Sequence, residues 1–72
     1  MNIKLFKSKM VLAGDTNASL ALALGITPQT NSAKLNGTHG SEYTRREIEL
    51  IRNRWNLTAE EIDLIFFANE VS

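Results

Sequence analysis

The sequence contains no cysteine and only one histidine, His39. Without cysteine, the fold cannot be cross-linked by disulfides and has no thiol for redox chemistry. A lone histidine falls short of the ligand set that protein zinc sites use, so we expect neither a metal nor another cofactor. Because a chain of 72 residues buries only about 60% of its unfolded surface, we expect its stability to come from close helix packing, from a partner subunit, or from both.

A long hydrophobic run is also missing. The apolar run at residues 20–24, which no other run exceeds in length, is far shorter than the ~20 apolar residues that cross a bilayer. Asp15 and Asn17 interrupt the apolar stretch that an export signal would need near the N-terminus. We therefore expect no membrane segment and a cytoplasmic protein.

The chain lacks a net charge, which is unusual for a protein that binds nucleic acid. The charges are nevertheless divided unevenly. Residues 1–54 carry all eight Lys and Arg and four acidic residues, whereas residues 55–72 carry four acidic residues and no base. This division favours a basic face that meets an anion and an acidic end that stays away from it. Helix-end electrostatics on a neutral protein would give the same pattern.

Apolar residues recur at helical spacing and almost never alternate, which predicts an all-α fold. Capping signals divide it into five short helices. Thr or Asn precedes each start, and two starts, at Thr44 and Thr58, carry a Thr-x-x-Glu capping box. Gly14, Gly25 and Gly37 mark helix ends. The expected helices, in a single domain, span residues 3–13, 17–24, 28–36, 45–55 and 59–68.

Residues 16–37 place a short Ala-rich helix, a turn containing Gly25 and a second short helix in succession. This is the layout of a helix-turn-helix, whose second helix enters the major groove of DNA. An ordinary corner between two bundle helices has the same layout. The DNA-binding interpretation is favoured because, with Leu35 facing inward, the outer half of the second helix carries amide, hydroxyl and small side chains that can read base edges. These outer residues are Gln29, Ser32, Ala33 and Asn36, flanked by Thr30 and Lys34.

Contacts to DNA phosphates are expected from groups around this helix. The start of the helix at 17–24 offers backbone N–H groups and the positive end of a helix dipole. Arg45 and Arg46 open a later helix, where their charge opposes the dipole, so an external anion would explain them as well as simple solvation does. The expected contacts to the DNA backbone are Thr16, Asn17, Lys34, Asn36, Thr38 and Arg45.

Several segments resemble a known family. Gly25-Ile26-Thr27 followed by Lys34-Leu35-Asn36-Gly37 resembles the lambda-repressor-like (Cro/C1-type) helix-turn-helix family, and residues 43–48 and 65–67 resemble small prophage regulators of that group. The resemblance covers nearly the whole chain. It implies a five-helix fold and a dimeric regulator of transcription that binds a double-stranded DNA operator at the nucleoid of a bacterial host cell. The base contacts that it implies are Pro28, Gln29, Thr30, Ser32 and Ala33.

The chain departs from this family at two positions. The family has an inward apolar residue at the position of Asn31, and burying an unpaired amide costs about 1–3 kcal/mol. Asn31 therefore finds partners, or the helix is rotated, or Asn31 itself faces DNA. Pro28 replaces a residue that is often a polar contact, and it has no N–H to donate. Base contacts are then few, and DNA shape carries more of the recognition.

The last helix carries more apolar surface than one core face needs. The stripe expected to face the core consists of Ile62, Ile65 and Phe66. A second stripe, on the other side, consists of Leu64, Phe67 and Val71. Exposed apolar stripes on small proteins mark interaction surfaces, so we expect a homodimer on the second stripe, unless the C-terminal segment folds back and buries both faces.

Catalysis is not expected. His39 lies in a glycine-containing loop without a predicted partner, and no nucleophile, acid–base or metal-ligand spacing recurs. The alternative to a DNA-binding protein is an interaction module on the same fold, an antirepressor or corepressor that binds a partner repressor protein. The zero net charge, Pro28 and Asn31 favour that alternative.

Overall fold

The computed structural model describes residues 1–37 and 40–67. Within them the chain forms five α-helices and no strand, so the expected all-α fold class is confirmed. The α-helices are α1 (Ile3–Leu12), α2 (Asn17–Leu24), α3 (Pro28–Asn36), α4 (Arg45–Trp55) and α5 (Ala59–Ile62), and a π-helix, η2 (Asp63–Phe67), continues α5. None of these described helices is long and apolar enough to span a membrane.

The helices begin where the capping signals predict. The N-cap residues are Asn2, Thr16, Thr27, Thr44 and Thr58. Each N-cap side chain accepts a backbone N–H from the first turn of its helix, which satisfies a donor that has no partner inside the helix. Gly25 and Gly37 end α2 and α3 at φ 74° and 67°, in the left-handed region that favours glycine. α1 ends at Leu12, one residue before the expected end.

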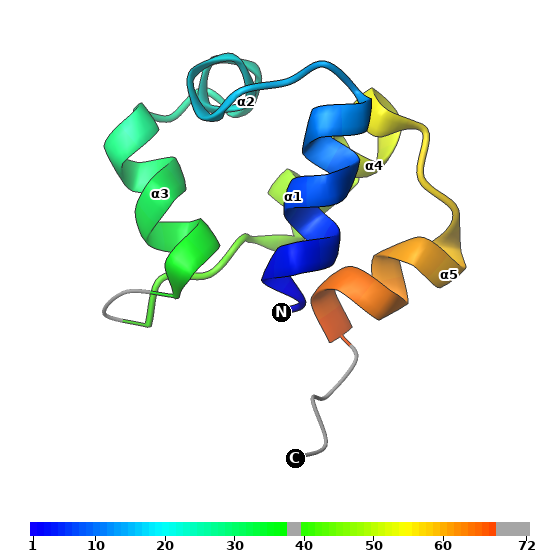
Figure 1. Cartoon of the computed structure of the whole chain (residues 1–72). Coiled ribbons are helices and arrows are strands. Elements are labelled where there is room, and N and C mark those ends of the chain that lie inside the picture. Colours follow the sequence, from blue (N-terminus) through cyan, green and yellow to red (C-terminus); the bar gives the residue numbers. More distant parts are fainter. Residues whose placement is uncertain (38–39, 68–72) are drawn as a thin grey trace.

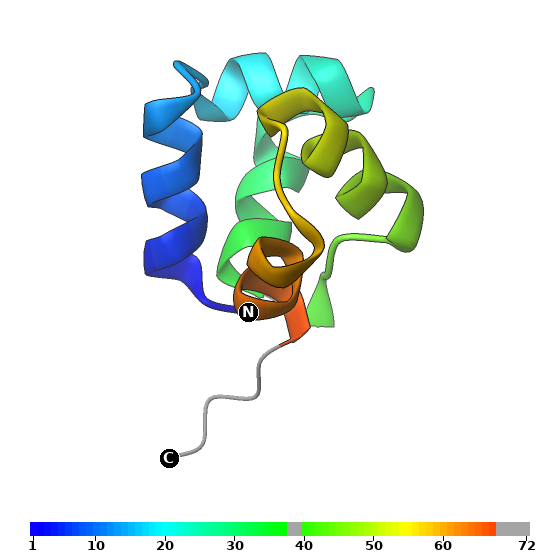
Figure 2. The same cartoon turned by 90° about the vertical axis from the view of Figure 1, so that its right-hand side faces the viewer.

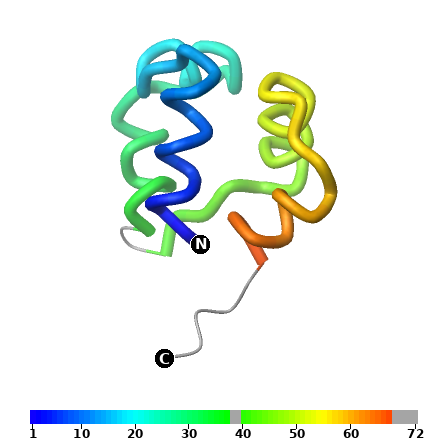
Figure 3. The backbone as a smooth tube through the Cα atoms, turned by 45° about the vertical axis from the view of Figure 1, so that its right-hand side comes forward, coloured from blue at the N-terminus to red at the C-terminus, as the bar shows by residue number. Residues whose placement is uncertain are grey.

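The helices fall into two groups. Figure 3 shows α1, α2 and α3 on one side and α4 and α5 on the other, with residues 40–44 running from one group to the other. α2 is seen almost end-on in Figure 1 and lies lengthwise along the top of Figure 2, so it crosses α3 steeply. α3 lies at one edge of the molecule and α5 near the opposite edge (Figure 1).

The core lies between the two groups and is centred on Phe6 of α1. Phe6 is fully buried, and its ring stacks on Tyr43 with a centroid distance of 5.4 Å. Trp55 and Phe66 pack against the same ring at 5.1 and 5.9 Å. Leu20, Leu35, Ile51 and Ile65 fill the space around this aromatic group. The expected inward positions of Leu35, Ile62 and Ile65 are thus confirmed.

The helix expected at 59–68 is not a continuous α-helix. Only Ala59–Ile62 is α-helical, and Asp63–Phe67 follows with the wider turn of a π-helix. Within this stretch the carbonyl of Ile65 accepts the N–H of Asn2, at the other end of the chain, at 2.7 Å. Such a tertiary contact leaves no trace in local apolar spacing, and the two inward residues Ile62 and Ile65 would be buried in either kind of helix.

The second apolar stripe of this region is exposed in its described part. Leu64 is 48% exposed and Phe67 is 59% exposed, whereas Phe66 is half-buried against the core. Val71, the third residue expected at a dimer interface, lies outside the described residues. Phe67 also borders a groove of about 370 Å³ that Leu35 and Asn36, at the end of α3, help to line.

Candidate functional site

The turn between α2 and α3 is held by backbone and side-chain hydrogen bonds. Gly25 adopts φ 74°, and the N–H of Ile26 donates to the carbonyl of Ala21 at 3.0 Å. Thr27 then caps α3 by accepting the N–H of Thr30 at 3.1 Å, with Pro28 at the first helical position. Pro28 suits this position because its fixed φ is helical and its missing N–H would have no partner there. The turn therefore sets the direction in which α3 leaves α2.

The first residues of α3, the helix predicted to read bases, are exposed to solvent. Pro28, Gln29 and Thr30 are exposed, whereas Ser32 and Ala33 are half-buried. Of the five predicted base contacts, the first three are therefore the most accessible, and Gln29 carries the amide that can pair with a base edge. Asn36, predicted to contact the DNA backbone, is exposed at the other end of α3.

Asn31 is fully buried and has hydrogen-bond partners at both ends of its amide. Its Nδ2 donates to Oδ1 of Asn17 at 2.6 Å, and its Oδ1 accepts the hydroxyl proton of Tyr43 at 2.6 Å. Of the three arrangements open from the sequence, Asn31 thus takes the one in which it faces inward and finds partners. The polar residue at an inward position costs little here because its hydrogen bonds replace those to water.

Asn17 links α2 to α3, a role that its position at the start of a helix did not suggest. Its side chain is half-buried, and its Nδ2 donates to the carbonyl of Pro28 and to the hydroxyl of Ser32, both at 3.1 Å. The side chain predicted to contact a phosphate therefore holds α2 to α3. Thr16, at the same helix start, is exposed, and its hydroxyl caps α2 by accepting the N–H of Ser19 at 3.1 Å.

Lys34 is paired inside the protein. Its ammonium group donates to Oε1 of Glu47 at 2.9 Å and to the carbonyl of Glu42 at 3.1 Å, and its side chain is only 14% exposed. Burial raises the pKa of Glu47, but hydrogen bonds from the Thr44 N–H and from Lys34 outweigh it, so the pKa is lowered and the ion pair persists at neutral pH. The one cation of α3 thus links α3 to α4 and has little freedom to meet a phosphate.

Arg45 is exposed at the start of α4. The same first turn carries Glu47, whose pair with Lys34 ties it to α3. There Arg45 and Glu49 border a groove of about 360 Å³ with Ile48, Ile62 and Phe67. Arg45, predicted to contact DNA, therefore lies beside the predicted dimer surface. Thr38 and His39 fall outside the described residues.

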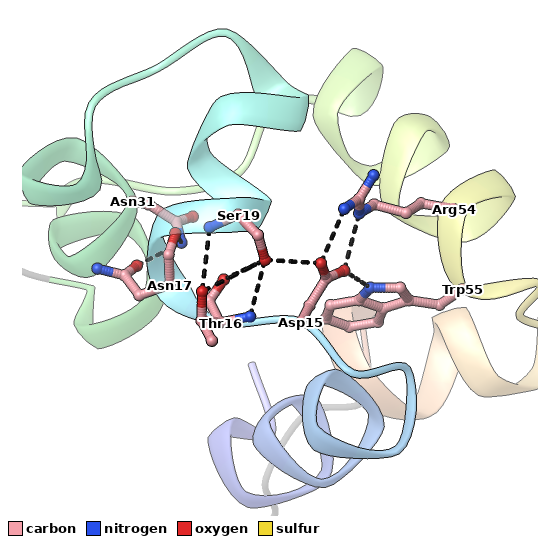
Figure 4. Close-up of polar contacts among 7 residues, drawn as sticks. All are labelled: Asp15, Thr16, Asn17, Ser19, Asn31, Arg54 and Trp55. Atoms are coloured by element: carbon pink, nitrogen blue, oxygen red, sulfur yellow. Dashed lines mark hydrogen bonds and ion pairs between the residues drawn. The ribbon is translucent and has the colours of Figure 1, made fainter.

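A second polar cluster, which sequence reasoning missed, surrounds Asp15 just before α2 (Figure 4). Its carboxylate accepts two hydrogen bonds from Arg54, both at 2.8 Å, one from the Trp55 indole at 2.6 Å and one from Ser19 at 2.8 Å. The bonds from Arg54 hold the pKa of Asp15 well below its usual value, with Trp55 and Ser19 adding to the effect and burial opposing it. We call these four residues the Asp15 cluster. The sequence signal was an acid beside a helix start.

The remaining questions are whether the protein has a metal site and whether its basic side chains are free to bind an anion. Among residues 1–37 and 40–67, no three His, Cys, Asp or Glu side chains lie close enough together to hold a metal ion. Lys9 is paired with Glu61, which ties α1 to α5. Lys34 and Arg54 are paired as described above, so several of the cations of the basic segment hold the fold together.

Comparisons with protein families, with curated proteins and with solved structures give no match to this chain. The case for its function therefore rests on its own residues and geometry.

Proposed function

We propose that this chain is a sequence-specific regulator of transcription that binds double-stranded DNA as a lambda-repressor-like (Cro/C1-type) helix-turn-helix protein. α2, the turn at Gly25 and α3 form the DNA-binding unit, and α3 enters the major groove. The single observation that carries the proposal is the start of α3. It lies at the edge of the molecule (Figure 1), presents Pro28, Gln29 and Thr30 to solvent, and is held against α2 by hydrogen bonds.

Direct base reading in this proposal is modest and comes from few side chains. The amide of Gln29 can bond N6 and N7 of adenine at once, and the methyl group of Thr30 can contact a thymine methyl. Lys34 is paired with Glu47, so it has little freedom to contact a phosphate. Affinity for DNA should still fall as salt is raised, with about 0.9 added to the slope of log K against log salt for each phosphate that the protein neutralises.

A selection from random duplex DNA at stated salt tests this proposal. The expected result is a motif with dyad symmetry. Gln29→Ala should lower the preference for that motif by about 1–3 kcal/mol, whereas Glu60→Ala, an exposed change on α5, should leave it unchanged. If the protein selects no motif, or if Gln29→Ala leaves the preference for the motif unchanged, then α3 does not read DNA.

The proposal includes a homodimer built on Leu64 and Phe67. Both are exposed, and Phe67 lies at the rim of the groove that Arg45 and Glu49 border. One face thus presents an aromatic side chain, a recess and one charge of each sign, and such a patch can be self-complementary when two identical subunits meet about a two-fold axis. Two such subunits would place their α3 helices about 34 Å apart, in successive major grooves.

Sedimentation tests the dimer separately from DNA binding. The wild type is expected to be dimeric at high micromolar concentration and Phe67→Glu monomeric, because a charge would be buried in an apolar contact. Glu60→Gln is the control, since it changes an exposed residue of the same region without adding a charge to the stripe. A monomeric wild type would remove the dimer from the proposal.

A second candidate function is favoured by other exposed apolar side chains. Leu22, Leu12 and Val11 are 82, 79 and 71% exposed, on α2 and on the last turn of α1. Such apolar exposure suits an antirepressor or corepressor that docks on a partner repressor protein. Binding to a repressor would persist as salt is raised, whereas binding to DNA would weaken, so a salt series distinguishes the two. Leu22→Ser should impair only the second function.

A further inference from the structure

A chain of hydrogen bonds between neutral groups runs from the core to the first turn of α3. The Tyr43 hydroxyl donates to Oδ1 of Asn31, and Nδ2 of Asn31 donates to Oδ1 of Asn17, both at 2.6 Å. Nδ2 of Asn17 then donates to the Pro28 carbonyl and to the Ser32 hydroxyl, both at 3.1 Å. We call Tyr43, Asn31 and Asn17 the amide chain. It joins the segment after α3, the middle of α3, the start of α2 and the first turn of α3.

The direction of the bonds in the amide chain is set at its end on α3. The Pro28 carbonyl can only accept a hydrogen bond, so the Asn17 amide must turn its NH2 group toward it. Oδ1 of Asn17 then faces Asn31, which must donate to it, and Oδ1 of Asn31 is left to accept from Tyr43. Reversing one amide would set acceptors against acceptors. The chain therefore favours one placement of α3 against α2.

The other end of the amide chain is anchored in the aromatic core. The Tyr43 ring stacks on Phe6 at 5.4 Å and meets Phe66 edge-on at 6.0 Å. Burial and the nearby Glu47 carboxylate raise the pKa of Tyr43, so its hydroxyl keeps the proton that it donates. Because Asn31 is fully buried and Tyr43 is buried, water does not readily replace a lost bond.

We propose that the amide chain positions the base-reading end of α3 and thereby determines how sharply the protein discriminates between DNA sequences. This inference rests on the proposed function. The bonds of the chain end on Pro28 and Ser32, which bracket the exposed Gln29 and Thr30. Base contacts depend on the exact placement of side chains, whereas phosphate contacts carry no sequence information. Loss of the chain should therefore weaken discrimination more than affinity for any duplex.

The test compares Tyr43→Phe with Ile51→Val. Tyr43→Phe keeps the stacked ring and removes only the hydroxyl, whereas Ile51→Val removes one methyl group from a fully buried residue of α4 outside the amide chain. Urea unfolding, followed by the fluorescence of Trp55, establishes that both remain folded with similar losses of stability. The measured quantity is the ratio of affinities for the selected operator and for a scrambled duplex. It should fall roughly tenfold in Tyr43→Phe and stay unchanged in Ile51→Val.

Amide hydrogen exchange gives a readout that needs no DNA. The N–H of Asn31, bonded to the Thr27 carbonyl, should exchange at least about tenfold faster in Tyr43→Phe than in Ile51→Val. Equal exchange in the two variants, or an equal loss of discrimination, would overturn the positioning role. If the wild type binds no duplex, the proposed function and its discrimination fail, while the exchange comparison still decides whether the chain positions α3.

Discussion

Two polar networks meet at the start of α2, and they differ in charge. The amide chain uses Asn17 and contains neutral groups, whereas the Asp15 cluster is built around a carboxylate and a guanidinium (Figure 4). Asp15 is nearly as well enclosed as Asn31, with a side chain 6% exposed. Neighbouring residues in sequence thus anchor two different kinds of network.

Because one network is neutral and the other charged, their strengths should depend differently on pH. The amide chain holds α3 with groups that keep their protonation at any pH near neutrality, so the predicted reading surface should be indifferent to pH. The Asp15 cluster ties the loop before α2 to the end of α4 through Arg54 and Trp55, and its strength depends on an ionised carboxyl. A charge introduced into the amide chain should therefore make it sensitive to pH, and removal of the charge from the Asp15 cluster should make that cluster insensitive to pH.

The largest effect is expected from Asn31→Asp, which puts a titratable group into the amide chain. At neutral pH a carboxylate would face Oδ1 of Asn17 in a fully buried position, and stability should fall by about 3–5 kcal/mol. Burial raises the pKa of such an aspartate, so stability should begin to return as the pH falls below that raised value and should go on rising until the pH reaches the unfolded pKa of about 3.9. Circular dichroism during urea unfolding at several pH values measures this, and a variant as stable as the wild type at neutral pH would contradict it.

Asp15→Asn is the opposite exchange, since it makes the charged cluster neutral. The loss of the charge-assisted bonds from Arg54 should reduce the free energy of unfolding by about 1–3 kcal/mol at neutral pH. The Trp55 indole donates to the same carboxylate, so its fluorescence reports the change directly. Arg54→Lys serves as a partner variant, because it keeps the charge and removes the two-pronged geometry.

Acid titration of the wild type should change its free energy of unfolding by a smaller amount, and the lowered pKa of Asp15 fixes the direction of the change. Arg54 holds the pKa of Asp15 below its usual value, so the stability from this group is fully present above the unfolded value of about 3.9. It is lost as the pH falls through the lowered value of the folded protein. Asp15→Asn should show a shallower loss of stability in acid. Parallel acid curves for the two proteins would mean that Asp15 is not the group that titrates.

Ser19→Ala should have the smallest effect. The Ser19 hydroxyl donates to Asp15 at 2.8 Å and accepts the N–H of Thr16 at 2.8 Å, so it links the Asp15 cluster to the α2 cap. Its removal should cost about 1 kcal/mol, because water can reach the exposed Thr16 and replace part of the loss. Thermal unfolding measures it, with Ala18→Ser on the exposed side of α2 as the control.

The helix boundaries and the exposed start of α3 follow from local sequence. Thr27 before Pro28 indicated where α3 begins, and Gly37 indicated where it ends. The inward position of Leu35 followed from helical spacing. These features depend on neighbours within about one helical turn, which is why the pattern of a single segment predicts them. The same spacing predicted the inward and outward sides of residues 62–67, but not their π-helical turn.

The roles of Asn17, Asn31 and Lys34 could not be predicted in this way. From the sequence, Asn31 is a polar residue at a position where an apolar one is expected. The structure explains it by its hydrogen bonds with Asn17 and Tyr43, which lie 14 and 12 positions away in the chain. Lys34 resembles a phosphate contact until Glu47, 13 positions away, is found bonded to it. A polar side chain has the same local signal whether its partner is solvent, DNA or another part of the chain.

The sequence by itself determined that this chain is all-helical, where its helices start, where α2, α3 and α4 stop, and which side of α3 faces the core, because caps and apolar periodicity act between near neighbours. Only the tertiary structure decided which polar groups form hydrogen bonds with other parts of the protein instead of facing solvent or a ligand. The partners of Asp15 lie up to 40 positions away, and hydrogen bonding between such groups depends on how the helices pack against one another rather than on any local pattern.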